Sequence, residues 1–155
     1  MMLWLYRLIF LPILMLSSPY YLWRMRKRGG YGRHFGDRFG GMKRCPARRL
    51  GVKRIWIQAV SVGELLAIGP LLERLAGERS LEIVLTTTTS TGFKLAEERY
   101  GRLAVAVGYF PIDVCFFSAR AWRHLEPDVA VLVEGEWWPE YFAQARRRGV
   151  PVYSI

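Results

Sequence analysis

The stretch IWIQAVSVGELLAIGPLLERLAG, residues 55–77, decides the fold because its hydrophobic pattern changes character within a few residues. Residues 55–60 form a short apolar run of the kind found in buried strands. From residue 64 the apolar positions recur at helical spacing until Gly77, a residue type that commonly ends helices. A strand that leads directly into a helix is the repeating unit of a parallel α/β sheet.

The same alternation continues to residue 155. We expect further strands over 81–88, 103–110, 127–135 and 150–155, and helices over 64–77, 90–101, 114–125 and 138–149. The strands lack polar alternation, as in parallel sheets that are covered by helices on both faces. We therefore predict a Rossmann-like parallel α/β sheet over 55–155. Because such a domain rarely ends within a strand, we also expect the chain to be part of a longer protein.

Positive charge is concentrated in one segment. Residues 24–54 hold twelve of the 23 basic residues and one of the 13 acidic residues, a net charge of +11. Residues 55–155 hold ten basic and twelve acidic residues, a net charge of −2. A nucleic-acid-binding domain carries basic residues on its folded face, so we expect no specific nucleic-acid partner. Residues 24–54 include seven glycines and show no periodicity, which predicts an irregular segment along a membrane surface or a solvated linker.

The N-terminus is apolar, and residues 8–23 contain no charge. Pro12 and Pro19 should disturb a helix there, but residues 1–23 together are long enough to cross a bilayer or to enter it obliquely. A cleaved signal peptide fits poorly, because the positive charges follow the apolar run and no small-residue cleavage site precedes Trp23. We predict a single membrane anchor over 1–23, a basic juxtamembrane segment over 24–54, and a domain that faces the cytoplasm.

The motifs give no indication of a cofactor. Cys45 and Cys115 lack metal-ligand spacing and are expected to be reduced thiols, and His34 and His124 have no partners at ligand spacing. The chain contains neither G-x-G-x-x-G nor a Walker sequence, which argues against a dinucleotide or ATP site. We predict no metal and no other cofactor.

Glu64 is the candidate catalytic residue, at the junction of the first strand and the first helix. Gly63 permits a tight turn, and Ser61 can cap the helix or contact a ligand. Leu65 and Leu66 should partly desolvate the acid, which suits a general base for a sugar hydroxyl. The alternative is a structural role, because the helix dipole stabilises acidic residues at helix N-termini.

Two other predicted strand ends should meet Glu64 at the same edge of the sheet. The stretch TTTTSTG at 86–92 offers hydroxyl and backbone N–H groups for a sugar or an anion, although strand propensity and helix capping also explain it. The stretch VEGEWWPE at 133–140 places Glu134 and Glu136 on alternate sides of an extended segment, beside tryptophans that suit sugar rings. A solvated strand end is the alternative for this second stretch.

The chain contains four motifs in this order: WIQAVSVGE, TTTTSTG, YFPID and VEGEWWPE. In this order and at these separations they resemble the N-terminal half of the Kdo (3-deoxy-D-manno-octulosonic acid) transferases of lipopolysaccharide synthesis. The resemblance extends from the apolar N-terminus through RHFGDRFG at 33–40 to RRRGVPVYSI at the end. It implies the acceptor half of a two-domain GT-B glycosyltransferase at the cytoplasmic face of the inner membrane. Such enzymes move Kdo from CMP-Kdo to a lipid A precursor with inversion at the anomeric carbon.

The resemblance also implies residue roles. Glu64 matches the general base that deprotonates the acceptor hydroxyl, and Glu134 and Glu136 match a glutamate motif in which we favour Glu134. The residues that we expect to bind the acceptor are Ser61, Gly63, Thr88, Thr89, Ser90, Glu134 and Glu136. Those expected to contact the membrane or the acceptor phosphates are Arg24, Arg26, Lys27 and Arg28.

Two departures from the family pattern stand out, since Gln58 replaces a common His and Glu140 replaces a common Asn. The donor domain that would bind CMP-Kdo is not among these residues, so we expect the chain to be inactive alone. Three alternatives stay open: a non-catalytic membrane-bound module that binds the lipid acceptor, a tethered nucleotide-binding domain, and nucleic-acid binding through residues 24–54.

Overall fold

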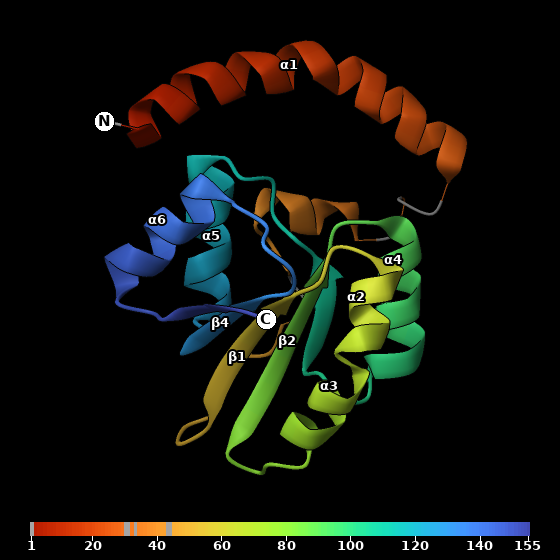
Figure 1. Cartoon of the computed structure of the whole chain (residues 1–155), viewed down its shortest axis with the longest axis vertical. Coiled ribbons are helices and arrows are strands. Elements are labelled where there is room, and N and C mark those ends of the chain that lie inside the picture. The colour runs from red at the N-terminus through yellow and green to blue at the C-terminus, as the bar shows by residue number, and fades with distance from the viewer. Residues whose placement is uncertain (1, 30–31, 33, 43–44) are drawn as a thin grey trace.

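A five-stranded parallel sheet forms the centre of the computed structural model (Figure 1). The structure describes residues 2–29, 32, 34–42 and 45–155, without the side chains of Met2 and Arg28. The neighbouring strands pair in parallel in the order β3-β2-β1-β4-β5. They are β1 (Lys53–Gln58), β2 (Leu81–Thr87), β3 (Ala106–Tyr109), β4 (Val129–Leu132) and β5 (Val152–Ser154). The predicted parallel α/β sheet with five strands is therefore confirmed.

Helices cover both faces of the sheet (Figure 1). One face carries α2 (Val62–Ala67), α3 (Gly69–Ala76) and α4 (Ser90–Leu95), which continues as a π-helix, η2 (Ala96–Tyr100). The other face carries α5 (Cys115–Leu125) and α6 (Pro139–Arg148). A short 3-10 helix, η1 (Phe35–Phe39), packs on α5 through the rings of Phe39 and Phe117, whose centroids are 5.1 Å apart.

Neighbouring residues of β1 belong to two separate cores. Trp56 lies in the core under α5 and α6, with its ring centroid 5.1 Å from that of Trp122 and 4.8 Å from that of Tyr141. Ile57 lies in the core under α2, α3 and α4, in a cluster that includes Leu65. Both residues of β1 are fully buried, which explains why this strand shows no polar alternation.

The helix predicted over 64–77 is wrong in one respect, because α2 and α3 are separate and meet at Ile68. Pro70 lies in the first turn of α3. Proline lacks an N–H group and its ring collides with the carbonyl group one turn earlier, so α2 cannot continue through it. The third strand also begins later than predicted, at Ala106, because the chain turns after η2 with a hydrogen bond from Leu103 N to Tyr100 O.

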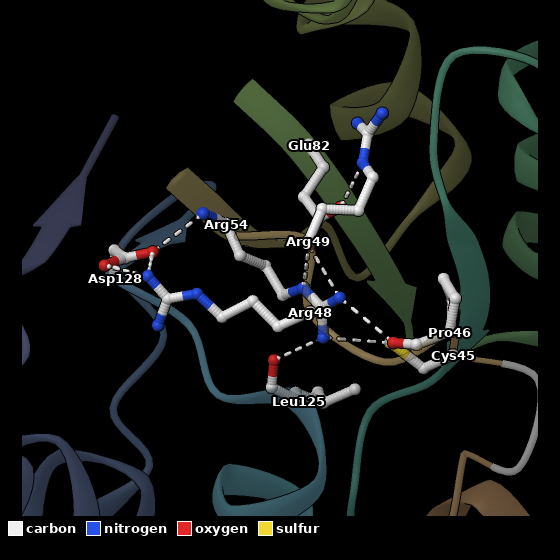
Figure 2. A network of polar contacts seen from close by, with 8 residues as sticks. All are labelled: Cys45, Pro46, Arg48, Arg49, Arg54, Glu82, Leu125 and Asp128. Atoms are coloured by element: carbon white, nitrogen blue, oxygen red, sulfur yellow. Dashed lines mark hydrogen bonds and ion pairs between the residues drawn. The ribbon is translucent and has the colours of Figure 1, made fainter. Parts of the chain in front are cut away.

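A network of charges closes the amino-terminal edge of the sheet (Figure 2). Arg54 is almost fully buried and pairs with Glu82, its register partner on β2, at 2.6 Å. The same guanidinium donates to the carbonyl oxygens of Leu125, at 2.8 Å, and Pro46, at 3.0 Å. Asp128 accepts from the backbone N–H of Arg54 at 2.9 Å, and Arg48 and Lys53 also pair with it. This part of the basic segment therefore contacts the domain.

The apolar N-terminus is one long helix, α1 (Met2–Arg28), despite Pro12 and Pro19. It arches over the edge of the domain at which α4 and α6 begin (Figure 1). Residues 24–28, which we predicted to be irregular, belong to this helix. Trp4 and Leu16 are 73% and 83% exposed, and α1 is long and apolar enough to cross a membrane by length and composition.

Candidate functional site

The candidate site lies at the carboxyl-terminal edge of the sheet, where the segments that follow β1, β2 and β4 meet. Hydrogen bonds join the first two segments, because the hydroxyls of Thr87 and Thr89 donate to Val60 O at 3.2 and 3.3 Å. The third segment lies beside them, because Glu136 is near enough to Gln58 and Glu64 for both residues to affect its pKa. The parallel topology thus gathers the predicted polar residues at one edge.

Glu64 lies in the first turn of α2 and is only 8% exposed. Ser61 is the N-cap residue, and its hydroxyl accepts from the backbone N–H of Glu64 at 3.3 Å. The Glu64 carboxylate reaches back, and its Oε2 accepts from Val60 N–H at 2.7 Å. This reciprocal arrangement closely resembles a capping box, so Glu64 has a structural role whatever chemistry it performs.

The neighbours of Glu64 differ from expectation in two ways. Gly63 does not form a tight turn, because it is a helical residue without positive φ. A β-carbon at Gly63 would contact only the Ser61 hydroxyl, at 3.8 Å. The surface at Gly63, beside the site, is therefore open. Leu65 is fully buried, but Leu66 is 44% exposed and points away from the core. Leu65 is therefore the neighbour that belongs to the apolar core.

The threonine stretch after β2 is mainly architectural. Thr89 is the N-cap residue of α4, and its hydroxyl accepts from Gly92 N–H at 3.0 Å. Thr88 accepts from the side-chain amide of Gln58 at 3.0 Å, and its carbonyl group accepts a hydrogen bond from Arg38. Ser90 is the half-buried first residue of α4. Capping, which was the alternative to ligand binding, accounts for Thr89.

Gln58 is an organising residue that the sequence marked only as a departure from the family pattern. Its amide oxygen accepts from the Thr86 hydroxyl at 2.8 Å, and its amide nitrogen donates to Thr88. Trp56 Nε1 donates to the same Thr86 hydroxyl at 2.8 Å. These bonds hold the Gln58 side chain at the end of β1, where it also lowers the pKa of the nearby Glu136. The neutral amide therefore links the ends of β1 and β2 and lies close to the segment after β4.

Glu136, rather than the favoured Glu134, lies close to Glu64. Burial raises the pKa of the Glu136 carboxyl and the nearby charge of Glu64 raises it further, while hydrogen bonds from Trp138 and Gln58 act in the opposite direction. The Trp138 Nε1 group donates to Glu136 Oε2 at 2.9 Å. Glu136 is therefore easier to protonate than an ordinary glutamate, which is useful in acid–base chemistry.

Glu134 is exposed, and the segment around it is not extended as we expected. Its φ of 54° is in the left-handed region, and its carbonyl group accepts from Glu136 N–H at 2.6 Å. This tight bend removes the strict alternation of side chains that an extended segment would have. Glu136 is therefore the glutamate of this motif that lies near Glu64, while the preference for Glu134 as the more important of the two stays a prediction.

The loop after β3 holds α1 and α6 together. Asp113 is almost fully buried and accepts hydrogen bonds from the backbone N–H groups of Glu140 and Tyr141, both at 2.9 Å, and from the Tyr6 hydroxyl at 3.0 Å. Burial raises the pKa of Asp113, and these hydrogen bonds oppose the rise. Arg7 forms two hydrogen bonds to the Glu140 carboxylate, one of them at 3.1 Å. The second departure from the family pattern, Glu140, thus binds the N-terminal helix.

Basic side chains lie at the far end of α1 and beside the site. Arg24, Arg26 and Lys27 are exposed near the C-terminus of α1, and Lys27 stacks over the Trp23 ring at 4.1 Å. The side chain of Arg28 lies outside the described residues. Arg38 lies over the Tyr109 ring at 4.7 Å, next to Thr88. Sequence reasoning missed Arg38, although it belongs to the quoted segment 33–40. Among the described residues, no group of three metal-ligating side chains is close enough to hold a metal ion.

Comparisons with known proteins agree with the four motifs. A family model described as 3-deoxy-D-manno-octulosonic-acid transferase (kdotransferase) matches residues 33–155. The 3-deoxy-D-manno-octulosonic acid transferase of Bordetella pertussis is 35% identical over 90% of this chain and 34% of the relative. The enzyme of the same name from Haemophilus influenzae is 32% identical over 93% of this chain and 31% of the relative. A Chlamydia trachomatis relative of the same name is 28% identical over 90% of this chain and 32% of the relative. The chain thus spans about a third of the length of these relatives.

Proposed function

The chain belongs to the family of 3-deoxy-D-manno-octulosonic acid (Kdo) transferases, and from this premise we propose that it is the acceptor half of a GT-B glycosyltransferase. The complete enzyme moves Kdo from CMP-Kdo to a lipid A precursor in lipopolysaccharide synthesis. A second domain, outside these 155 residues, binds CMP-Kdo. The chain alone therefore binds the acceptor but does not catalyse transfer.

In the proposed reaction, Glu64 acts as the general base. Its carboxylate takes the proton from the acceptor hydroxyl, and the hydroxyl oxygen forms a bond to the anomeric carbon of Kdo. The bond from that carbon to the CMP phosphate breaks, CMP leaves with the electron pair, and the configuration inverts. The observation that carries this proposal is the position of Glu64, a largely buried carboxylate at the helix N-terminus next to the open surface at Gly63 and near Glu136.

The other residues of the edge serve to position the acceptor. Ser61 and Thr89 hold the two helix N-termini, and the open surface at Gly63 leaves space for a sugar next to Glu64. Thr88, Ser90 and Glu136 present groups that hydrogen-bond to sugar hydroxyls, with Glu134 at the exposed rim. None of these roles requires a metal or another cofactor.

The proposed location is the cytoplasmic face of the inner membrane. The apolar α1 attaches the domain there, and Arg24, Arg26 and Lys27 bind anionic headgroups or acceptor phosphates, at about 1 kcal/mol for each basic residue near the surface. Because α1 arches over the edge that holds Glu64, a lipid acceptor in the membrane can present its sugar to the base (Figure 1).

A transfer assay tests this function. The chain is mixed with the separately expressed C-terminal part of the Bordetella pertussis relative, with CMP-Kdo and a radiolabelled lipid A precursor that carries four acyl chains. We expect transfer only in the mixture, and a loss of about 10²- to 10⁴-fold with Glu64→Gln, which removes the base but keeps its size. The matched control, Glu73→Gln on the exposed surface of α3, should retain full activity.

Two results would contradict the proposal. Transfer that survives Glu64→Gln at the wild-type rate would exclude Glu64 as the base. Transfer in none of the mixtures, with acceptor binding intact, would favour the non-catalytic acceptor-binding module.

A further inference from the structure

We propose that α1 lies in the plane of the membrane surface and does not cross the bilayer. This inference rests on the membrane attachment proposed above. The feature that carries it is the contact between the N-terminal end of α1 and the folded domain. Tyr6 and Arg7 bind buried groups of the domain, Asp113 and Glu140, which are 2% and 0% exposed.

The C-terminal end of α1 is tied to the same domain. Only residues 29–34 connect it to η1, and six residues span at most about 20 Å when fully extended. Within η1, Phe39 packs against Phe117 and Arg38 stacks on Tyr109. Both ends of the helix are therefore held on the same side of any membrane that the domain contacts.

A spanning orientation is incompatible with these contacts. The distance from Tyr6 to Arg28 along the helix axis is about 33 Å, because an α-helix rises 1.5 Å per residue. The hydrocarbon core of a bilayer is about 30 Å thick, so a helix that crossed it would place Tyr6 at the far interface. Tyr6 and Arg7 could not then reach Asp113 and Glu140 on the cytoplasmic side.

The outward surface of α1 fits the interface of an anionic leaflet. Large apolar side chains are exposed along its length: Trp4, Leu5, Leu8, Ile9, Leu11, Ile13, Met15, Leu16, Tyr20, Tyr21, Leu22 and Trp23. Tryptophan and tyrosine occur near both ends, and the C-terminal end carries exposed basic residues. These are the side chains that favour the headgroup region of a membrane.

The N-terminal end of α1 contacts the domain and not water. Beside Tyr6 and Arg7, Phe10 lines a mainly apolar cavity of about 170 Å³ together with Val114 and Phe116 at the start of α5. An in-plane helix normally needs a polar side for water, but at this end the domain takes the place of water.

Thiol labelling in a Gram-negative host distinguishes the two orientations. A Gly-Ser-Cys tag is joined to Met1 of the chain, and a membrane-impermeant maleimide is added to intact spheroplasts or to inside-out vesicles. We expect the tag to be labelled in inside-out vesicles only, as is a Glu73→Cys variant, whose position on α3 faces the cytoplasm. The untagged chain corrects for Cys45 and Cys115.

Labelling of the tag in intact spheroplasts would overturn the in-plane orientation while leaving membrane attachment standing. Recovery of the chain in the soluble fraction would overturn the attachment and with it this inference. A charge swap adds a second readout. Arg7→Glu should speed the amide hydrogen exchange of residues 3–12, and the double variant Arg7→Glu/Glu140→Arg should slow it again. Equal exchange in all three proteins would show that the contact does not hold the helix.

Discussion

The two edges of the sheet use charge in opposite ways. At the amino-terminal edge, the buried Arg54 lies against Glu82, and Arg48 lies against Asp128 (Figure 2). Lys53 also pairs with Asp128, so every one of these charges faces an opposite charge. At the carboxyl-terminal edge, the nearby charge of Glu64 helps to raise the pKa of Glu136, whose burial is the main cause of the rise. Opposite charges stabilise the fold, whereas neighbouring like charges reduce stability and favour proton transfer. The difference separates a structural edge from the edge at which we propose that transfer takes place.

Of the substitutions that test this difference between the edges, Arg54→Met should have the largest effect, a loss of stability. It leaves Glu82 buried without its main partner, and we expect the free energy of unfolding to fall by about 3–5 kcal/mol. Urea denaturation measures the loss. The double variant Arg54→Met/Glu82→Leu removes both charges and should recover most of the stability. A loss below about 1 kcal/mol in the single variant would mean that the amino-terminal edge does not depend on this pair.

A smaller effect, on activity, is expected from Glu136→Gln. The substitution removes a carboxylate that we propose contacts the acceptor beside Glu64, so we expect the transfer rate at neutral pH to fall about tenfold, which corresponds to about 1.4 kcal/mol. Burial and the nearby Glu64 raise the pKa of Glu136, so any part of the acidic limb of the pH–rate profile that reports the Glu136 carboxyl should be absent in the variant. Stability should not decrease, because a repulsion is removed.

Glu134→Gln is the matched control for that prediction, because Glu134 is exposed and lies two residues away. It should leave the pH profile unchanged and lower the rate less than Glu136→Gln does, because Glu134 lies at the exposed rim. The reverse result, with Glu134→Gln impaired and Glu136→Gln normal, would favour the original preference for Glu134.

The smallest effect is expected from Asp128→Asn. Although partial burial opposes ionisation, hydrogen bonds from Arg54 N–H, Lys53 and Arg48 keep the pKa of Asp128 below its ordinary value. Ionised Asp128 therefore stabilises the fold above the unfolded value of about 3.9, and this contribution is lost as pH falls through the lowered value. We expect the variant to be less stable by about 0.5–1 kcal/mol at pH 7 and equal to wild type in strong acid. A difference that is independent of pH would contradict this.

Sequence reasoning predicted the parts of the fold that depend on local patterns. Hydrophobic periodicity predicted the five strands and their alternation with helices, and parallel topology then predicted that the polar strand ends would meet. It missed the break at Ile68, because the apolar spacing continues through Pro70. It also missed the bend at Glu134, since a left-handed glutamate is uncommon and the local pattern gives no signal for it.

The contacts between distant residues could not be predicted from one sequence. Tyr6 reaches Asp113 across 107 positions, and Arg7 reaches Glu140 across 133. Such pairs depend on where the folded chain brings α1, and neither has a characteristic spacing. Gln58 and Glu140 could be noticed only as departures from the family pattern, and their hydrogen bonds show what the two departures do.

The central claim is that Glu64 is a base and not only a helix cap. Chemical rescue tests this claim most directly. Glu64→Ala removes the carboxylate and leaves space beside the site, and the transfer assay is run with the donor domain, with and without added formate. We predict that the variant folds, loses transfer, and regains part of the rate as formate is added, because formate supplies a carboxylate in the vacated space. Wild-type activity in Glu64→Ala, or a folded and inactive variant that formate does not restore, would contradict the account.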